Sequence, residues 1–304
     1  MRIKLEKRPE PSTLMLFVTP VASVLLTMFI GMIVFDLLGI DGFRAVIDIF
    51  LTPLLASYKW QDVAVKAAPL VIIALGLSVG NRAQVWNIGA EGQYIIGALC
   101  AAGVGIAAGT AGGPIVILAM ILAGIAGGIA WAWIPAVLRT RYGVNEILTS
   151  LMLVYVAFQV LAYLVGGPWK DPNGRNFPAT APLQPNQELL ILFPGTTVHL
   201  GVLIAVILPF VFWILMSRSV FGFQIRAVGS APQAARYGGF DTKRTIILSL
   251  LIGGAMAGLA GALEFTGALG TINLGFPSGY GFTAIIVSFL GRLNPIGCLI
   301  AGIV

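Results

Sequence analysis

The chain has 304 residues, of which 58% are hydrophobic and 10% are charged, and its mean hydropathy is +0.95. Because soluble domains carry about a quarter of charged residues, this composition excludes an ordinary soluble protein. Long apolar runs, each near the roughly 20 residues that cross hydrocarbon, also exclude a transmembrane barrel of short alternating strands. We predict an all-α, polytopic helical membrane protein, in which the net charge of +6 reflects topology rather than nucleic-acid binding.

The apolar segments follow a short charged arm at residues 1–13. About eight are expected, some of them broken or re-entrant, at residues 14–38, 63–80, 85–108, 115–138, 145–166, 198–216, 245–267 and 282–304. The first is too long for the apolar part of a signal peptide. Residues 41–60 are of mixed character and predict an outer amphipathic or partly inserted helix. The last segment is broken at 291–295 and reaches Val304 without a flanking charge, so we expect the sequence to be incomplete at its C-terminus.

The positive charges orient these segments. Twelve of the 18 Lys and Arg residues fall on one side of this layout, at positions 2, 4, 7, 8, 82, 139, 141, 218, 226, 236, 243 and 244. Four fall on the other side, at positions 44, 59, 170 and 175. Because cytoplasmic loops are enriched in Lys and Arg, we predict that the N-terminus and the loop 217–244 are cytoplasmic, in a plasma or inner membrane, and that the loop 167–197 is outside.

Polar side chains interrupt the apolar pattern between residues 76 and 105. Asn87, Glu91 and Gln93 lie within about one bilayer thickness of each other. A carboxylate inside a membrane is costly unless it faces protein or a water-filled cavity, so a translocation site is the default hypothesis. Asn87 and Glu91 are four residues apart and would share one face of a helix. The alternative is a packing region in which these polar groups satisfy one another.

Two further carboxylates fall near segment ends. Glu264 comes late in its segment, and Gly253, Ala257 and Ala260 precede it on one helical stripe. We expect this stripe to pack against another helix and to bring Glu264 to a cavity in the outer half, where a pathway role and a structural role are both open. Glu146 stands at the start of its helix, where a negative charge is favourable, so a structural role is expected there.

The inner loop contains helix start signals at residues 230–237 (SAPQAARY). Ser230 occupies the expected N-cap, Pro232 the first turn and Gln233 the capping-box position. Gly238 would end the helix after about two turns. A capped helix of this size suits a rigid knob that docks into a partner protein, and the alternative is a solvated surface helix.

The sequence lacks the motifs of an enzyme. It has no GxxxxGK[ST] run to cradle phosphates, so any ATP must be hydrolysed by another subunit. With His199 as the single histidine, neither a base for nucleophilic catalysis nor a histidine metal site can be assembled. Cys100 and Cys298 fall in apolar segments and are expected to be small buried residues. We therefore expect no catalytic residues, metal or cofactor in this chain.

Three runs of the sequence resemble a known family: GNRAQVWNIGAEGQYIIGA (80–98), VNEILTSLML (144–153) and FGFQIRAVGSAPQAARYGG (221–239). They are similar to permease subunits of bacterial ABC importers for nucleosides and simple sugars, which are related to branched-chain amino acid and ribose permeases. The resemblance extends from about Ser57 to the last residue. It implies a single transmembrane permease domain over 1–304 that forms half of a translocation pathway, with nucleosides as the leading substrate class and simple sugars next.

The resemblance also implies partners and site residues. In such permeases the segment like 221–239 forms a coupling helix in a cleft of the ATPase, so the loop 217–244 is expected to dock there. The expected contact residues are Arg226, Gly229, Ser230, Gln233, Ala234, Ala235 and Gly238. The expected pathway residues are Asn87, Glu91, Gln93 and Glu264. The expected partners are ABC ATPase subunits that use ATP, a second permease in a homo- or heterodimer, and an extracellular substrate-binding lipoprotein.

Two other transport classes compete with this hypothesis. A proton-coupled secondary transporter would use Glu91 and Glu264 as proton carriers, but a self-powered carrier has no need of a helix that docks on an ATPase. An ion channel is disfavoured because the sequence shows no repeated ring of charges and no filter-like carbonyl loop. Dependence of uptake on a co-expressed ATPase would separate the ABC permease from both of these classes.

Overall fold

The computed structural model describes residues 13–56 and 59–304. The chain divides into two units, Met1–Trp60 and Gln61–Val304, and each is described by itself. Apart from connections and isolated β-bridges, the described residues are helical, and six of their helices are long and apolar enough to cross a membrane. The prediction of an all-α, polytopic membrane protein is therefore confirmed.

The first unit consists of short helical elements after one long apolar helix. They are α1 (Thr13–Leu37), α2 (Gly42–Val46), the π-helix η1 (Ile47–Leu51) and α3 (Thr52–Leu55). Carboxylates close the turn after α1, since Asp36 accepts a hydrogen bond from the Gly42 backbone (2.8 Å) and Asp41 caps α2 by accepting one from the Arg44 backbone (3.0 Å). The charged arm predicted at the N-terminus lies, up to residue 12, outside the described residues.

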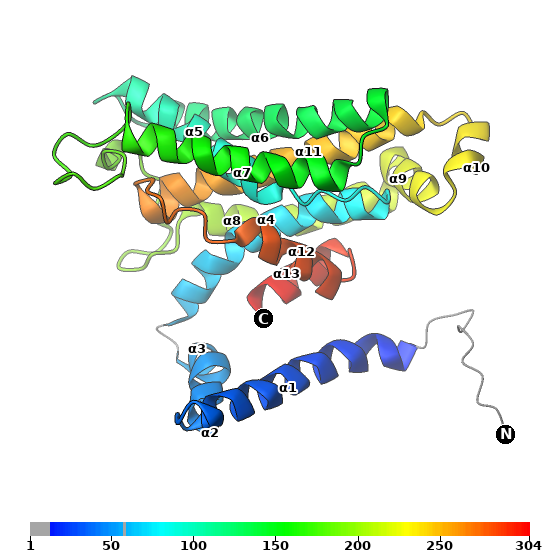
Figure 1. Ribbon diagram of the computed structural model, residues 1–304, viewed down its shortest axis with the longest axis horizontal. Coiled ribbons are helices and arrows are strands. Elements are labelled where there is room, and N and C mark those ends of the chain that lie inside the picture. The colour runs from blue at the N-terminus through cyan, green and yellow to red at the C-terminus, as the bar shows by residue number, and fades with distance from the viewer. Residues whose placement is uncertain (1–12, 57–58) are drawn as a thin grey trace. The chain divides into compact units, whose positions relative to one another are not determined.

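The second unit holds the remaining helices. They are α4 (Trp60–Arg82), α5 (Ala90–Ala108), α6 (Pro114–Tyr142), α7 (Glu146–Gly166), α8 (Leu200–Arg218), α9 (Val220–Ser230), α10 (Pro232–Tyr237), α11 (Thr242–Glu264), α12 (Tyr280–Leu290) and α13 (Pro295–Ile303), with the 3₁₀-helix η3 (Pro185–Gln187) and the π-helix η4 (Phe265–Leu269). In Figure 1, α5, α6, α7 and α11 run side by side, with α9 and α10 at one end of this unit and the loop 167–199 at the other.

Glycines let the three central helices α5, α6 and α11 touch through their backbones. A Cβ atom added at Gly97 or at Gly124 would overlap or press on the backbone of Gly258, and one added at Gly128 would overlap Gly254. Since small residues permit the close approach that stabilises helix pairs in membranes, these contacts fix the core of the unit. Gly124 and Gly128 are four residues apart on α6, so both face the same partner helix, α11.

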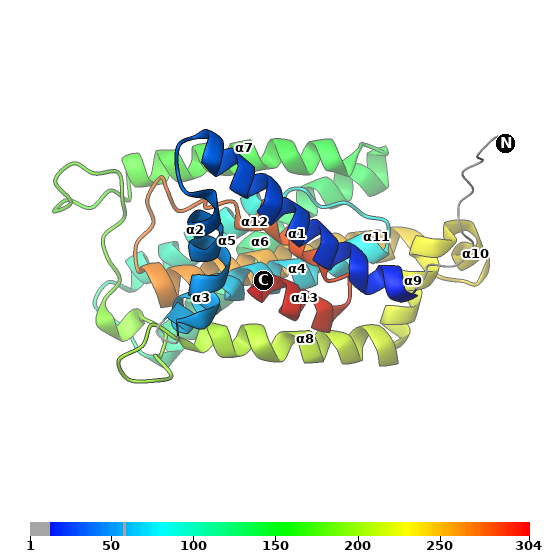
Figure 2. The same cartoon turned by 90° about the horizontal axis from the view of Figure 1, so that it is seen from below.

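The final apolar stretch forms two short helices instead of one spanning helix. The predicted break at residues 291–295 is confirmed, and Arg292 and Leu293 there have positive φ angles of 56° and 57°. Asn294 then caps α13 by accepting a hydrogen bond from the Ile296 backbone (3.0 Å). Helix α13 packs against α8 and α12 (Figure 2). With 11 residues, α12 is only about 16 Å long, about half the thickness of the hydrocarbon layer.

Candidate functional site

The N-terminus of α12 is held by a buried carboxylate from α5. Glu91 is completely buried, and its two oxygens accept hydrogen bonds from the backbone N–H groups of Gly279 (3.0 Å) and Gly281 (2.5 Å). A Cβ atom at Gly281 would overlap the backbone of Glu91, so only glycine permits this approach. The negative charge therefore lies where the free N–H groups and the helix dipole favour it.

Asn87 and Gln93 form a reciprocal amide pair beside this carboxylate. The Asn87 amide donates to Gln93 Oε1 (2.8 Å), the Gln93 amide donates to Asn87 Oδ1 (3.2 Å), and the Gly89 backbone also donates to Asn87 Oδ1 (3.1 Å). The expectation that Asn87 and Glu91 share a helix face is wrong, because α5 begins only at Ala90 and Asn87 lies in the connection before it. The hydrogen bonds between Asn87 and Gln93 agree with the alternative hypothesis, in which these polar groups satisfy one another. A role of these residues in the translocation pathway stays a prediction.

Glu264 is the last residue of α11 and differs from Glu91 in its bonding. Its side chain is 6% exposed and forms no hydrogen bond or close ion pair with any residue that the structure describes. The predicted stripe of Gly253, Ala257 and Ala260 is buried with it, and Gly253 packs against Gly76 of α4. Glu91 is thus held by hydrogen bonds, whereas Glu264 has only electrostatic interactions with the described residues, among them one with Lys66 of α4.

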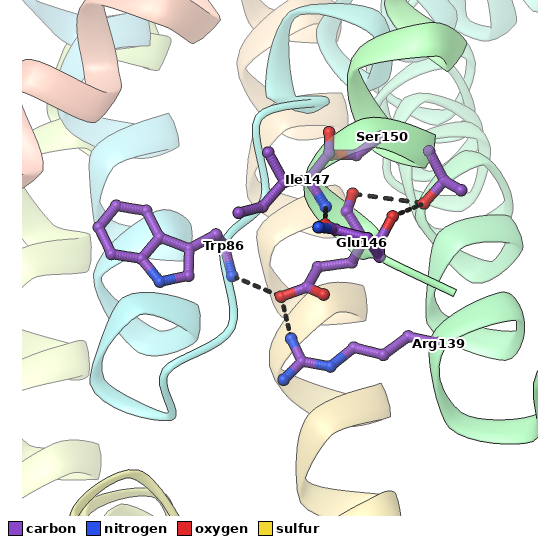
Figure 3. Close-up of polar contacts among 7 residues, drawn as sticks. Trp86, Arg139, Glu146, Ile147 and Ser150 are labelled. Carbon is purple, nitrogen blue, oxygen red and sulfur yellow. Dashed lines mark hydrogen bonds and ion pairs between the residues drawn. The ribbon is translucent and has the colours of Figure 1, made fainter. Parts of the chain in front are cut away.

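Glu146 joins three segments of the second unit (Figure 3). Its carboxylate forms an ion pair with Arg139 of α6 and accepts a hydrogen bond from the backbone of Trp86, in the connection between α4 and α5 (3.3 Å). Asn145 caps the same helix by accepting a hydrogen bond from the Ile147 backbone (2.9 Å). The structural role expected for Glu146 agrees with this geometry. Glu146 also holds the connection between α4 and α5 in place through its bond to Trp86.

His199 lies at the N-terminus of α8, outside the spanning helices. Its Nδ1 atom accepts a hydrogen bond from the Gly201 backbone (3.1 Å), so the proton of the neutral ring is on Nε2, which has no partner among the described residues. Burial lowers the pKa of His199, which keeps the ring neutral near pH 7. No group of three His, Cys, Asp or Glu side chains gathers in the described part of the chain.

The loop 217–244 contains two short helices, and their boundary differs from the predicted one. The assignment of Ser230 as an N-cap is wrong, because Ser230 ends α9 and its hydroxyl donates to the Ala227 carbonyl oxygen (3.3 Å). Ala231 precedes α10 and supplies no side-chain cap. Helix α9 has a true cap in Ser219, whose Oγ accepts from the Gly222 backbone (3.0 Å). The predicted start signals at 230–233 thus mark a kink between two helices.

Helix α9 rests directly on the end of α4. A Cβ atom at Gly229 would overlap the carbonyl group of Arg82, the last residue of α4, so the two backbones are in contact. Arg226, on the same helix, donates a hydrogen bond to the Met216 carbonyl oxygen of α8. The connection 83–89, which carries Asn87, starts just after Arg82. A displacement of α9 would therefore be transmitted to this connection through the backbone contact between Gly229 and Arg82.

Helix α10 presents most of its surface to solvent. Gln233 and Ala234 are exposed, and Tyr237 is 95% exposed. Ala235, expected beside Ala234 on the docking surface, is instead buried at 5% exposure. The Gly238 backbone N–H donates to the Ala234 carbonyl oxygen (2.9 Å) and ends the helix, as predicted.

A family model described as branched-chain amino acid transport system / permease component matches residues 60–304. The chain belongs to this permease family. The permease is 35% identical to the glucose ABC transporter permease protein TsgB13 of Haloferax volcanii, over all of this chain and 82% of that protein. It is 32% identical to the guanosine ABC transporter permease protein NupP of Bacillus subtilis, over 78% of this chain and 68% of that protein. No solved structure matches it.

Family membership decides between the transport classes. The family is a transport component rather than an enzyme, and the relatives are ABC permeases, which supports this class over the proton-coupled carrier. Family membership and the long apolar helices together show that the chain is a multi-pass membrane protein.

Sequence reasoning missed three aromatic residues of the permease that meet beside Glu91. They are Tyr94 of α5, Phe276 of the connection before α12, and Tyr280 of α12. The partners of Tyr94 come about 180 residues later in the chain, and no spacing within either segment indicates that they meet. Only the packing of α12 against α5 brings them together.

Proposed function

We propose that this chain is the membrane-spanning permease subunit of an ABC importer, forms half of the path for a nucleoside or a simple sugar, and is powered by separate ATPase subunits. The arrangement of α9 and α10 carries this proposal. Helix α10 offers an exposed surface that includes Tyr237, a residue type enriched at the centres of protein interfaces. Helix α9 connects that surface to the bundle through the contact between Gly229 and Arg82.

The proposed partners follow from the same arrangement and from the relatives. The exposed surface of α10 would occupy the ATPase cleft, a second permease would complete the path, and an extracellular lipoprotein would deliver the solute. Glucose and guanosine, named for two relatives, are both uncharged ring compounds with many hydrogen-bonding groups. The proposed path residues are amides and carboxylates, which can bond such solutes without a counter-ion.

Uptake by reconstituted vesicles tests the proposal. The permease is combined with its ATPase, its second permease and its receptor, and uptake of radiolabelled guanosine or glucose is measured with ATP inside. Uptake of one solute should stop when the ATPase carries an inactivating substitution of its own P-loop lysine. Uptake that continues with the inactive ATPase and collapses with a proton gradient would instead support the secondary transporter.

We predict that α10 is cytoplasmic and that the loop around Asn173 is extracytoplasmic, because twelve of the 18 positive charges lie on the α10 side of the predicted layout. Gly229 is unsuitable as a probe because a side chain there would strike Arg82, so the exposed Ala234 is used. In a background without Cys100 and Cys298, a membrane-impermeant thiol reagent added outside should label Asn173→Cys and leave Ala234→Cys unlabelled. The reverse pattern would overturn the orientation.

A further inference from the structure

An aromatic cluster fills the space between α5 and the start of α12. The Tyr94 ring stacks on the Phe276 ring, with centroids 5.1 Å apart and planes 19° apart. The Tyr280 ring meets Tyr94 edge-on, with centroids 5.9 Å apart and planes 69° apart. Tyr94 follows Glu91 by three residues on α5, so the cluster lies directly beside the capped N-terminus of α12.

The cluster contains a buried hydroxyl that has no partner. Tyr94 is completely buried, and its hydroxyl forms no hydrogen bond with any described residue. Glu264, which also forms no hydrogen bond with the described residues, interacts electrostatically with this hydroxyl and with Lys66 of α4. A Cβ atom at Gly261, three residues before Glu264, would overlap the Tyr94 carbonyl group, so α11 touches α5 here. Since a buried polar group without a partner is costly, the Tyr94 hydroxyl, within electrostatic range of a carboxylate that accepts no hydrogen bond from the described residues, indicates a site that is completed by something else.

The residue that covers Tyr94 belongs to a connection, not to a helix. Phe276 lies between η4 and α12, in a segment with positive φ angles at Gly270 (64°) and Gly279 (79°). Thr180 of the loop 167–199 bonds this segment at Ile272, through its backbone N–H (2.9 Å) and its hydroxyl (3.0 Å). The outer loop is thus tied to the backbone four residues before Phe276, so a displacement of that loop would pull on the cover of Tyr94.

We propose that Tyr94, Tyr280 and Glu264 form a binding site for an uncharged ring-shaped solute, and that Phe276 occupies the solute's place on Tyr94 when the site is empty. This proposal rests on the proposed function and adds to it a binding site within this chain. The solute ring stacks on Tyr94 in place of Phe276. A substituent that extends past the edge of the Tyr94 ring accepts a hydrogen bond from the Tyr94 hydroxyl, and another donates one to Glu264. The Tyr94 hydroxyl then has the hydrogen-bond partner that it lacks when the site is empty.

The chemistry of the cluster selects the class of solute. An aromatic face binds a flat base or the apolar face of a sugar ring, and a carboxylate accepts hydrogen bonds from N–H or hydroxyl groups alike. A solute that carries a negative charge is disfavoured, because Glu91 and Glu264 both lie beside the rings. A nucleoside and a simple sugar share the required features, and separate arms of the test distinguish them.

Equilibrium dialysis of the purified permease complex without its receptor measures this site directly. Radiolabelled guanosine is the probe in one arm and radiolabelled glucose in the other. Phe276→Leu removes the competing ring, so the affinity for one of the two probes should rise roughly two- to tenfold, the size of one stacked ring pair. Tyr94→Phe removes one oxygen atom and keeps the ring, so the affinity for that probe should fall roughly two- to tenfold, the size of one hydrogen bond.

Two exposed residues of the spanning helices provide matched controls. Tyr155→Phe on α7 and Phe210→Leu on α8 repeat the two substitutions at sites that are 60% and 51% exposed, and both should bind the probes like the wild type. A purely structural cluster would give weaker or unchanged binding in Phe276→Leu and unchanged binding in Tyr94→Phe, and either result overturns the inference. Wild-type uptake that depends on the ATPase would then leave the proposed function standing. Absence of such uptake would overturn the proposed function and this inference with it.

Discussion

Glu91→Ala should remove most of the uptake and much of the stability of the permease. Without the carboxylate, the buried N–H group of Gly281 and the partly buried N–H group of Gly279 lose their acceptor, and a buried group left unpaired costs about 1–3 kcal/mol. We therefore expect the free energy of unfolding to fall by at least about 1–3 kcal/mol. Uptake should fall more than about tenfold, because α12 loses the bonds that fix its N-terminus.

Substitutions that keep part of the side chain separate hydrogen bonding from charge. In Glu91→Gln the amide oxygen can accept from one glycine, while the amide N–H₂ group faces the other donor. Its melting temperature and uptake should lie between those of the wild type and of Glu91→Ala. Thermal unfolding of the purified protein, followed by tryptophan fluorescence, gives the first quantity, and ATPase-dependent uptake gives the second.

Glu188→Ala is the control for this series, because Glu188 is a glutamate of the same unit with an exposed side chain. It should leave the melting temperature and the uptake at wild-type values. A Glu91→Ala protein that melts and transports normally would show that the carboxylate does not hold α12. One that melts normally but transports nothing would assign Glu91 to the path instead of the cap.

Local features of the sequence were sufficient for most of the long helices and for some of their ends. The apolar runs have the length that the membrane requires, and Gly291 and Pro295 mark the break in the last one, so both could be predicted. Asn145 caps α7 through its own neighbours in sequence. Ser230 failed as a cap because Ile225 and Val228 bury α9 as far as that residue, and tertiary packing overrides a local start signal.

The bonding of the polar residues could not be predicted, because it joins distant parts of the chain. Glu91 bonds to glycines about 190 residues later, and no pattern near Glu91 specifies which helix N-terminus it meets. The four-residue spacing of Asn87 and Glu91 fits a helix, but the chain turns at Gln84, where φ is 56°, and remains non-helical as far as Gly89. Spacing alone does not distinguish one helical turn from a turn closed by an amide pair.

The combined variant Ala234→Asp/Tyr237→Ala should separate the ATPase from the permease and leave the membrane bundle intact. Both side chains are exposed on α10, so the changes remove an aromatic contact and add a charge to the proposed docking surface without altering the core. Truncation of an interface hot spot costs about 2 kcal/mol or more, so the affinity for the ATPase should fall about thirtyfold or more. Co-purification with the ATPase and stimulated ATP hydrolysis measure this loss.

Ala235 shows why the exposed pair is the sharper test. Asp at this buried position would place a charge inside the packing of α10, so a loss of ATPase binding there could arise from unfolding of the helix itself. The Ala234→Asp/Tyr237→Ala protein should instead keep the wild-type melting temperature, because a short surface helix contributes little to the bundle. Asn173→Asp adds the same charge to the loop at the opposite end of the unit and should change neither binding nor uptake. Full ATPase binding and full uptake by the α10 variant would show that α10 is only a solvated connector, which removes the observation that carries the proposed function.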